Sequence, residues 1–156
     1  MRRIVLLLLV EWVLITGCQT GNMPAFNILL PDSSVVVRSE EIPSGKSIVF
    51  VYFKSDCAYC HEETQGLINK IEDFKSTLFY FVTTEDVVAA REYRDFYKLS
   101  RFENIKIGVD TAKFFPSNYN AGGTPVLVVF DRYKRLRGVY GGVMKADTLL
   151  QVLRKL

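Results

Sequence analysis

Hydrophobic residues fall into short runs along the chain, separated by polar segments and turn residues. Residues 48–53 are apolar without alternation, which is the pattern of a central strand covered on both faces. Two apolar runs that flank the polar segment 131–134 predict a β-hairpin. The predicted strands are residues 26–30, 34–38, 48–53, 78–82, 105–109, 126–130 and 136–140.

Apolar residues at helical spacing predict three helices. In the first helix the spacing involves Leu67, Ile68, Ile71 and Phe74, and the acids that follow Thr84 suit the positive end of the second. The predicted helices are residues 61–74, about 84–99 and 147–156. Strand–helix–strand units followed by a hairpin and a helix predict an α/β fold. We expect a mixed central β-sheet with helices on both faces and a short N-terminal strand extension.

The first 18 residues have the layout of a secretory signal. Arg2 and Arg3 form a basic head, an apolar segment of about 12 residues follows, and small residues precede Cys18. The apolar segment is shorter than the roughly 20 residues that a membrane-spanning helix needs. Residues 15–18 resemble the bacterial lipobox, which implies that Cys18 is lipidated and tethers the mature protein. Glu11 departs from an export signal, and a buried N-terminal helix or strand is the alternative interpretation.

The predicted organisation is a lipoprotein-type signal peptide at 1–18, a polar tether at 19–25 and one domain at 26–156. The formal net charge is +3, and basic and acidic residues alternate through the mature part. The densest basic group lies at 132–137, on the predicted hairpin turn, where a solvated tip is the simpler interpretation. Nothing in this pattern argues for nucleic acid as a partner.

Cysteine usage singles out one pair of residues. The chain has three cysteines, and lipidation of Cys18 leaves Cys57 and Cys60 in C-x-x-C spacing between a predicted strand and a predicted helix. Unpaired N–H groups at a helix N-terminus stabilise a thiolate, so Cys57 is the candidate nucleophile. Cys60 lies one turn deeper and suits the resolving thiol of a redox-active disulfide.

Four neighbours are candidates for tuning the thiols: Lys54, Asp56, Tyr59 and His61. The Lys54 ammonium favours a Cys57 thiolate, whereas the Asp56 carboxylate opposes it. Asp56 is also a natural N-cap, and its carboxylate would compete with the sulfur for the same backbone amides. We therefore expect a moderately lowered pKa for Cys57.

In these features the chain resembles the thioredoxin fold, and within it the thioredoxin-like lipoproteins and TlpA-like reductases of bacterial envelopes. The resemblance covers about residues 26–156. It rests on residues 26–30 leading to Gly45-Lys46, on the strand that enters Cys57-Ala58-Tyr59-Cys60, and on Gly123-Thr124-Pro125 before a strand. It implies that Pro125 is cis and packs beside the cysteine pair, and that the backbone of Thr124 pairs with an incoming substrate.

The resemblance also implies a thiol–disulfide oxidoreductase that needs no dissociable cofactor. The implied partners are disulfide-containing envelope proteins, a membrane thiol electron donor, and a lipid membrane that holds Cys18. The implied location is the bacterial cell envelope, facing the periplasm. Where thioredoxin has a buried aspartate this chain has Val51, and where thioredoxin has a tryptophan it has Asp56. Ala58-Tyr59 is nearer the Gly-Tyr pair of bacterial disulfide isomerases, so the direction of electron flow stays open.

Three alternatives stay open beside this interpretation. Residues 57–61 match the C-x-x-C-H motif of c-type haem attachment, with His61 and either Met23 or Met144 as axial ligands. Small c-type cytochromes are mostly helical, which disfavours haem here. A zinc site needs about four ligands, and only Cys57, Cys60 and His61 are available, so no metal is expected. A non-catalytic binding module with a structural disulfide is the third alternative, although a disulfide across so short a loop stabilises little.

Overall fold

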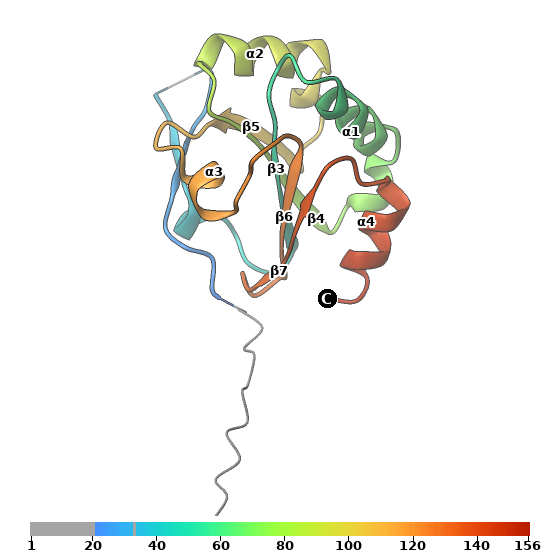
Figure 1. Cartoon of the computed structure of the whole chain (residues 1–156). Helices are drawn as coiled ribbons and strands as arrows, with labels where there is room; N and C mark the ends of the chain where they lie inside the picture. The colour runs from blue at the N-terminus through green and yellow to red at the C-terminus, as the bar shows by residue number, and fades with distance from the viewer. Residues whose placement is uncertain (1–20, 33) are drawn as a thin grey trace, which may run out of the picture.

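A computed structural model describes residues 21–32 and 34–156, which form a seven-stranded sheet and four α-helices (Figure 1). The strands are β1 (Asn27–Leu29), β2 (Val36–Arg38), β3 (Ser47–Tyr52), β4 (Thr77–Thr83), β5 (Ile105–Val109), β6 (Val126–Phe130) and β7 (Leu136–Gly141). The helices are α1 (Ala58–Asn69), α2 (Val87–Phe96), α3 (Phe114–Asn118) and α4 (Ala146–Leu153). The predicted α/β fold with a mixed sheet is confirmed.

The sheet places the strand before the cysteine motif between two partners. Its order is β2-β1-β5-β4-β3-β6-β7, and β3 pairs in parallel with β4 and antiparallel with β6. In this register Phe50 lies between Tyr80 and Val128. Since both faces of β3 are covered, every residue of 48–52 is buried, which explains the apolar run without alternation.

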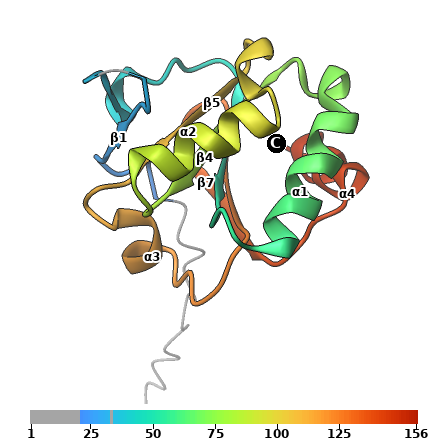
Figure 2. The same cartoon turned by 90° about the horizontal axis from the view of Figure 1, so that it is seen from above.

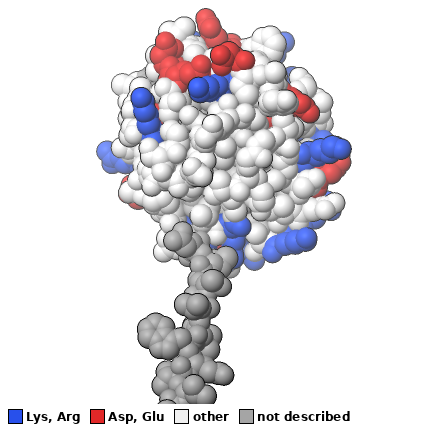
Figure 3. Space-filling view, viewed as in Figure 1, with Lys and Arg blue, Asp and Glu red and all other residues white. Residues whose placement is uncertain are grey.

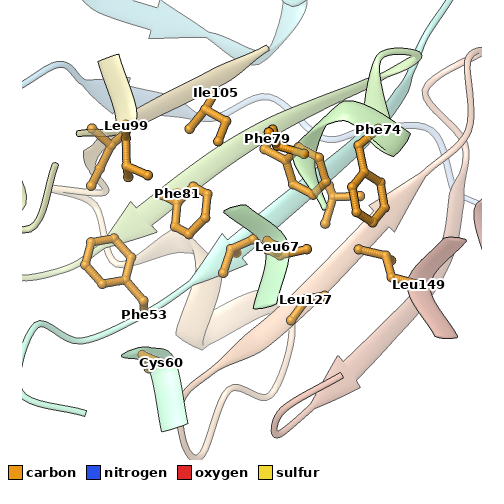
Figure 4. Packing of buried hydrophobic residues seen from close by; sticks show 14 of the residues in the cluster. Phe53, Cys60, Leu67, Phe74, Phe79, Phe81, Leu99, Ile105, Leu127 and Leu149 are labelled. Atoms are coloured by element: carbon orange, nitrogen blue, oxygen red, sulfur yellow. The ribbon is translucent and has the colours of Figure 1, made fainter. Parts of the chain in front are cut away.

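One face of the sheet packs against three helices. Phe81 and Leu127 point from the strands toward Cys60 and Leu67 of α1 (Figure 4), and Val51 belongs to the same cluster. Leu149 of α4 and Tyr93 of α2 belong to the same buried cluster. The dithiol helix is therefore fixed along its length by the main hydrophobic core.

The opposite face carries the short helix α3 and the segment that precedes β1. Figure 2 shows α3 on the other side of the sheet from α1 and α4. An aromatic cluster fills this side: the ring centroid of Phe26 lies 5.2 Å from that of Phe50 and 5.1 Å from that of Phe115. Helices cover both faces as predicted, but unequally.

Three local predictions differ from the structure. Helix α3 was not predicted, because five residues are too few for a periodic pattern and Pro116 indicates a break. The second helix begins at Val87 rather than Thr84, because the Asp86 side chain caps it by accepting from the Ala89 N–H at 2.9 Å. The first helix ends at Asn69 and continues as a 3₁₀ turn over Ile71–Phe74.

The predicted signal peptide and Cys18 lie outside the described residues. The part of the predicted tether that is described runs along the hairpin between β6 and β7. The Met23 N–H donates to the Lys134 carbonyl at 2.8 Å, and the Leu136 N–H donates to the Gly21 carbonyl at 3.0 Å. Within residues 21–32 and 34–156, no helix is long and apolar enough to cross a membrane.

Candidate active site

The two cysteines lie where the central strand turns into α1. β3 ends at Tyr52, and the Cys57 N–H closes a turn by donating to the Lys54 carbonyl at 3.3 Å. Cys57 has extended backbone angles and is itself the N-cap of α1. The prediction that Asp56 is the N-cap is therefore wrong, because the helix starts one residue later and uses sulfur as its capping acceptor.

Backbone groups surround the Cys57 sulfur. The Cys60 N–H donates to the Cys57 Sγ at 3.2 Å, and the Cys57 thiol donates to the Thr124 carbonyl at 3.4 Å. Both cysteines are free thiols. Cys57 is half-buried, whereas Cys60 is only 1 % exposed. An incoming disulfide therefore meets Cys57 first.

The surroundings give the two thiols different acidities. Burial opposes ionisation of Cys57, but hydrogen bonds from the Cys60 thiol and from the N–H groups of Cys60 and Tyr59 outweigh it, so its pKa is lowered. Burial is the main cause that raises the pKa of Cys60 to about 12, and its hydrogen bond to Cys57 adds to this. Of the two thiols, Cys57 is therefore the one that ionises more readily, in the direction expected from its place at the helix N-terminus.

A loop from a distant part of the chain completes the site. The Thr124–Pro125 peptide bond is cis, and the buried Pro125 is held by the Gly142 N–H, which donates to its carbonyl at 2.9 Å. The Thr124 carbonyl lies against the Cys57 sulfur. Among the described residues, no hydrogen bond engages the Thr124 N–H. The structure thus brings Thr124 and Pro125 to the dithiol, with one backbone donor left for another molecule.

The side chains of the four tuning candidates do not contact the sulfurs within the described part of the chain. Lys54 and Asp56 are exposed, and Tyr59 is 66 % exposed. Lys54 and Tyr59 act through the backbone instead: the Lys54 backbone lowers the pKa of Cys60, and the Tyr59 N–H lowers that of Cys57. Lys54 and Tyr59 therefore influence the pKa values of the thiols through backbone hydrogen bonds rather than through side-chain charge.

The ring of His61 is held by the protein at both nitrogens. Nε2 lies 2.9 Å from the Ser55 carbonyl, and Nδ1 lies 2.6 Å from the Tyr97 hydroxyl. Because a carbonyl only accepts, Nε2 carries the proton, and in the neutral ring Nδ1 accepts from Tyr97. An axial haem ligand needs a free ring nitrogen, so haem attachment would require this network to break.

Two features of the site were not predicted, and the first is a clamp on the loop before Cys57. The Glu85 carboxylate accepts from the Ser55 N–H at 2.7 Å and from the Ser55 hydroxyl at 2.9 Å. Together with the His61 contact, this ties residues 54–56 to the segment that begins α2. The sequence holds no signal for it, since Glu85 follows Ser55 by 30 residues.

The second is a buried carboxyl behind the dithiol. Glu63 is only 1 % exposed and accepts from the Met144 N–H through Oε2 at 2.6 Å, whereas Oε1 has no partner among the described residues. Burial raises the pKa of Glu63 to about 7. Its spacing from Cys60 and Leu67 on the inward stripe of α1 was the available signal. This chain thus has an ionisable group near its cysteines although Val51 replaces the aspartate of thioredoxin.

Among residues 21–32 and 34–156, no group of three or more histidine, cysteine, aspartate or glutamate side chains is positioned to hold a metal ion. The end of the molecule that carries the dithiol is acidic, as the group of Asp and Glu side chains at the top of Figure 3 shows. A nucleophilic thiol beside a buried thiol and an open backbone donor can exchange disulfides with an extended chain.

A family model of thioredoxin-like domains matches residues 39–156. The chain belongs to the thioredoxin-like domain family. The predicted resemblance and the predicted thioredoxin-like fold are thereby confirmed, and members of this family are generally thiol–disulfide oxidoreductases. No curated protein matches the sequence.

Several solved thioredoxin-like structures are similar to this one. A secreted disulfide oxidoreductase of Mycobacterium tuberculosis, homologous to E. coli DsbE, has 18% identity and a TM-score of 0.69, with 84% of this chain and 96% of that chain covered. The thioredoxin domain of a thiol-disulfide oxidoreductase from Bacteroides vulgatus has 18% identity and a TM-score of 0.67, covering 87% and 95%. The exposed lipoprotein thioredoxin of Streptococcus pneumoniae has 20% identity and a TM-score of 0.62, covering 85% and 100%. At these identities the likeness shows the shared fold.

Proposed function

We propose that this protein is a thiol–disulfide oxidoreductase of the bacterial cell envelope that reduces disulfides of exported proteins. The observation that carries the proposal is the pairing of a half-buried Cys57 of lowered pKa with a buried Cys60 of raised pKa. Such a pair divides the work between an attacking and a resolving thiol. Thr124 and Pro125 lie where they would position the partner chain.

In the first step, the Cys57 thiolate attacks one sulfur of the substrate disulfide. A bond forms between this sulfur and Cys57, the substrate disulfide breaks, and the released substrate thiolate takes up a proton from solvent. The Thr124 N–H is placed to bind a carbonyl of the substrate backbone during this step. Cys60 does not make this first attack on the substrate, because its thiol is protonated and buried.

In the second step, Cys60 loses its proton and attacks the Cys57 sulfur. The mixed disulfide breaks, the second substrate thiol leaves, and Cys57 and Cys60 are left as a disulfide. Two electrons have passed to the substrate, so a second dithiol must reduce the protein before the next cycle. By its resemblance to envelope reductases, we assign this role to a membrane thiol electron donor, and the cycle needs no dissociable cofactor.

The proposed location rests on the N-terminal sequence. The basic head, the apolar segment and Cys18 support export and lipid anchoring, with the domain facing the periplasm. Similar structures include a secreted oxidoreductase and an exposed lipoprotein, which agrees with an extracytoplasmic site for this one. The substrates we propose are accordingly disulfide-containing envelope proteins.

The test is the reduction potential of the Cys57–Cys60 pair, measured in glutathione buffers. We expect a value near −270 mV, typical of thioredoxin-like reductants. A value near −120 mV would make the protein an oxidant and reverse the proposed direction of electron flow. If no reversible disulfide forms between the two cysteines, the oxidoreductase proposal is wrong.

The order of attack has its own test, with matched single variants. Incubated with a disulfide-bonded substrate, Cys60→Ser should accumulate a mixed disulfide through Cys57, because the resolving thiol is missing. Cys57→Ser should accumulate none, since the remaining thiol is buried and protonated. If Cys57→Ser accumulated a mixed disulfide and Cys60→Ser did not, Cys60 would be the attacking thiol and Cys57 the resolving thiol.

A further inference from the structure

The end of the molecule opposite the dithiol carries exposed basic side chains that the disulfide chemistry does not use. We call the surface formed by Lys46, Lys75, Arg132 and Arg135 the basic end; all four side chains are exposed. Backbone contacts hold them together: the Gly45 N–H donates to the Arg132 carbonyl at 3.0 Å, and Lys46 Nζ donates to the Lys75 carbonyl at 3.2 Å. Figure 3 shows Lys and Arg side chains over the lower part of the molecule; the acidic group at the top has other Lys and Arg side chains beside it.

The acids near the basic end leave it positive. Asp131 is buried and accepts from both Arg135 and Arg137, at 2.9 and 2.6 Å, so one of these two charges is uncompensated. Glu72 pairs with Lys75 at 3.1 Å, and Glu72 and Glu103 line the same pocket as Lys46, Lys75 and Arg101. Lys46 and Arg132 form no ion pair among the described residues. Glu40 lies at the margin, where its carbonyl accepts from Lys134 Nζ at 3.0 Å.

An aromatic side chain projects from the middle of this surface. Tyr133 is 61 % exposed at the tip of the hairpin between β6 and β7. The guanidinium carbons of Arg132 and Arg135 lie 5.3 and 5.0 Å from the centre of its ring. An exposed tyrosine between two arginines combines an amphipathic ring with cations, which is the chemistry of contact with lipid headgroups.

The chain enters the domain at the same place. Asn22 bridges to Arg135, and Gly21 and Met23 bond to the hairpin strand beside it. Cys18, the predicted lipid attachment point, precedes Gly21 by three residues, which span at most roughly 10 Å. A lipid-anchored form would therefore hold the basic end close to a membrane.

We propose that the basic end binds the surface of an anionic lipid bilayer and sets the orientation of the domain on the membrane. The dithiol then faces away from the lipid, because β6 runs from Pro125 beside Cys57 to the hairpin over five residues, a length of roughly 17 Å. The binding adds to the lipid anchor and does not require it. It is also independent of the proposed disulfide chemistry.

The test uses a fragment of residues 21–156, which contains both hydrophobic clusters and all seven strands and so holds the whole folding unit. We expect it to co-sediment with vesicles that contain phosphatidylglycerol, at low salt, and not with pure phosphatidylcholine vesicles. Each basic residue near a membrane surface contributes roughly fivefold in affinity. Lys46→Ala with Arg132→Ala should therefore bind about 25-fold more weakly.

The matched control is Lys54→Ala with Lys145→Ala, which removes two exposed cations from the dithiol end. This pair should bind the vesicles as the unchanged fragment does. The only tryptophan of the chain is Trp12, so Tyr133→Trp places a single tryptophan in the fragment. Its emission should shift to the blue on phosphatidylglycerol vesicles, since the ring leaves water.

Four outcomes would overturn the proposal. The first two are that the fragment does not bind the anionic vesicles, or that it binds a short DNA duplex equally tightly. The other two are that the Lys46→Ala, Arg132→Ala variant keeps its affinity for the vesicles, or that the Lys54→Ala, Lys145→Ala control loses as much affinity as that variant. Equally tight binding to DNA would mean that the basic end recognises polyanions in general. A disulfide-reduction assay on the same fragment reports the proposed enzyme activity separately, so failure of one proposal is distinguishable from failure of the other.

Discussion

The two thiols near the sheet end differ in acidity, and a buried carboxyl lies on the same helix as Cys60. Cys57 is acidic because backbone N–H groups at the start of α1 point at its sulfur, and Cys60 is not, because it is buried. Glu63 shares the buried environment of Cys60 on the same helix. Burial raises its pKa to about 7.

Replacing Glu63 by Gln should flatten the pH dependence of stability. Burial raises the pKa of Glu63 from 4.5 to about 7, so the native state binds this proton more tightly than the unfolded chain. The free energy of unfolding therefore falls as the pH rises through that window, by at most about 3 kcal/mol for this group. Urea unfolding at about pH 5 and about pH 8 measures the fall.

Glu92→Gln is the control, since Glu92 is an exposed glutamate whose charge is not among the causes that raise the pKa of Glu63. It should lose as much stability between the two pH values as the unchanged protein. If Glu63→Gln loses as much stability between the two pH values as the unchanged protein, the Glu63 carboxyl is not protonated in the native state. The description of Glu63 as a buried acid is then wrong.

At the scale of elements, the dithiol loop depends on α2 as well as on β3 and α1. Glu85 holds both the N–H and the hydroxyl of Ser55, and Tyr97 at the end of α2 holds His61. Each of these contacts joins residues that are far apart in the chain. The position of Cys57 is thus fixed from two sides, by its own helix and by the neighbouring one.

Glu85→Ala should free residues 54–56 and slow the reaction of Cys57. Losing the two hydrogen bonds to Ser55 should lower the free energy of unfolding by about 1–3 kcal/mol. The rate of Cys57 alkylation should fall, and its pH midpoint should move toward that of a free cysteine, because the backbone donors lose their alignment. Alkylation rates from about pH 5 to about pH 10 measure both.

Glu92→Ala controls for charge, because it removes an exposed acid from α2 without touching Ser55. Loss of an acid by itself favours the thiolate, so this control should leave the midpoint unchanged or lower it slightly. A shift of equal size and sign in both variants would mean that Glu85 acts through its charge and not by positioning the loop.

For the molecule as a whole, two hydrophobic clusters on opposite faces of one sheet hold the fold without help from a disulfide. The larger cluster includes Cys60 only as one small member among aliphatic and aromatic side chains (Figure 4). On the face shown in Figure 3, acids gather at the top, whereas Lys and Arg side chains lie over both the upper and the lower part.

Replacing Cys57 and Cys60 together by alanine should abolish disulfide reduction and leave the fold intact. We expect the free energy of unfolding to stay within about 1 kcal/mol of that of the reduced protein, since a four-residue disulfide loop stabilises little. Urea unfolding measures this. A loss of several kcal/mol relative to the oxidised protein would instead support a structural disulfide in a binding module.

The sequence by itself determined the fold class, all seven described strands to within two residues, and the cysteine pair at the start of a helix. These features are local: apolar runs, helical spacing and turn residues report on the chain within a few positions of themselves. The resemblance to thioredoxin-like domains added Thr124 and Pro125, which no local pattern connects to Cys57.

Tertiary structure alone decided the rest. Glu85 reaches Ser55, Tyr97 reaches His61, and the tether runs beside Arg135 only because the sheet order brings distant segments together. Asp56 lost its predicted capping role for a similar reason, since the turn closed by Cys57 sets where the helix begins. Burial raises the pKa of Glu63, and burial is a property of the packed molecule rather than of the residue.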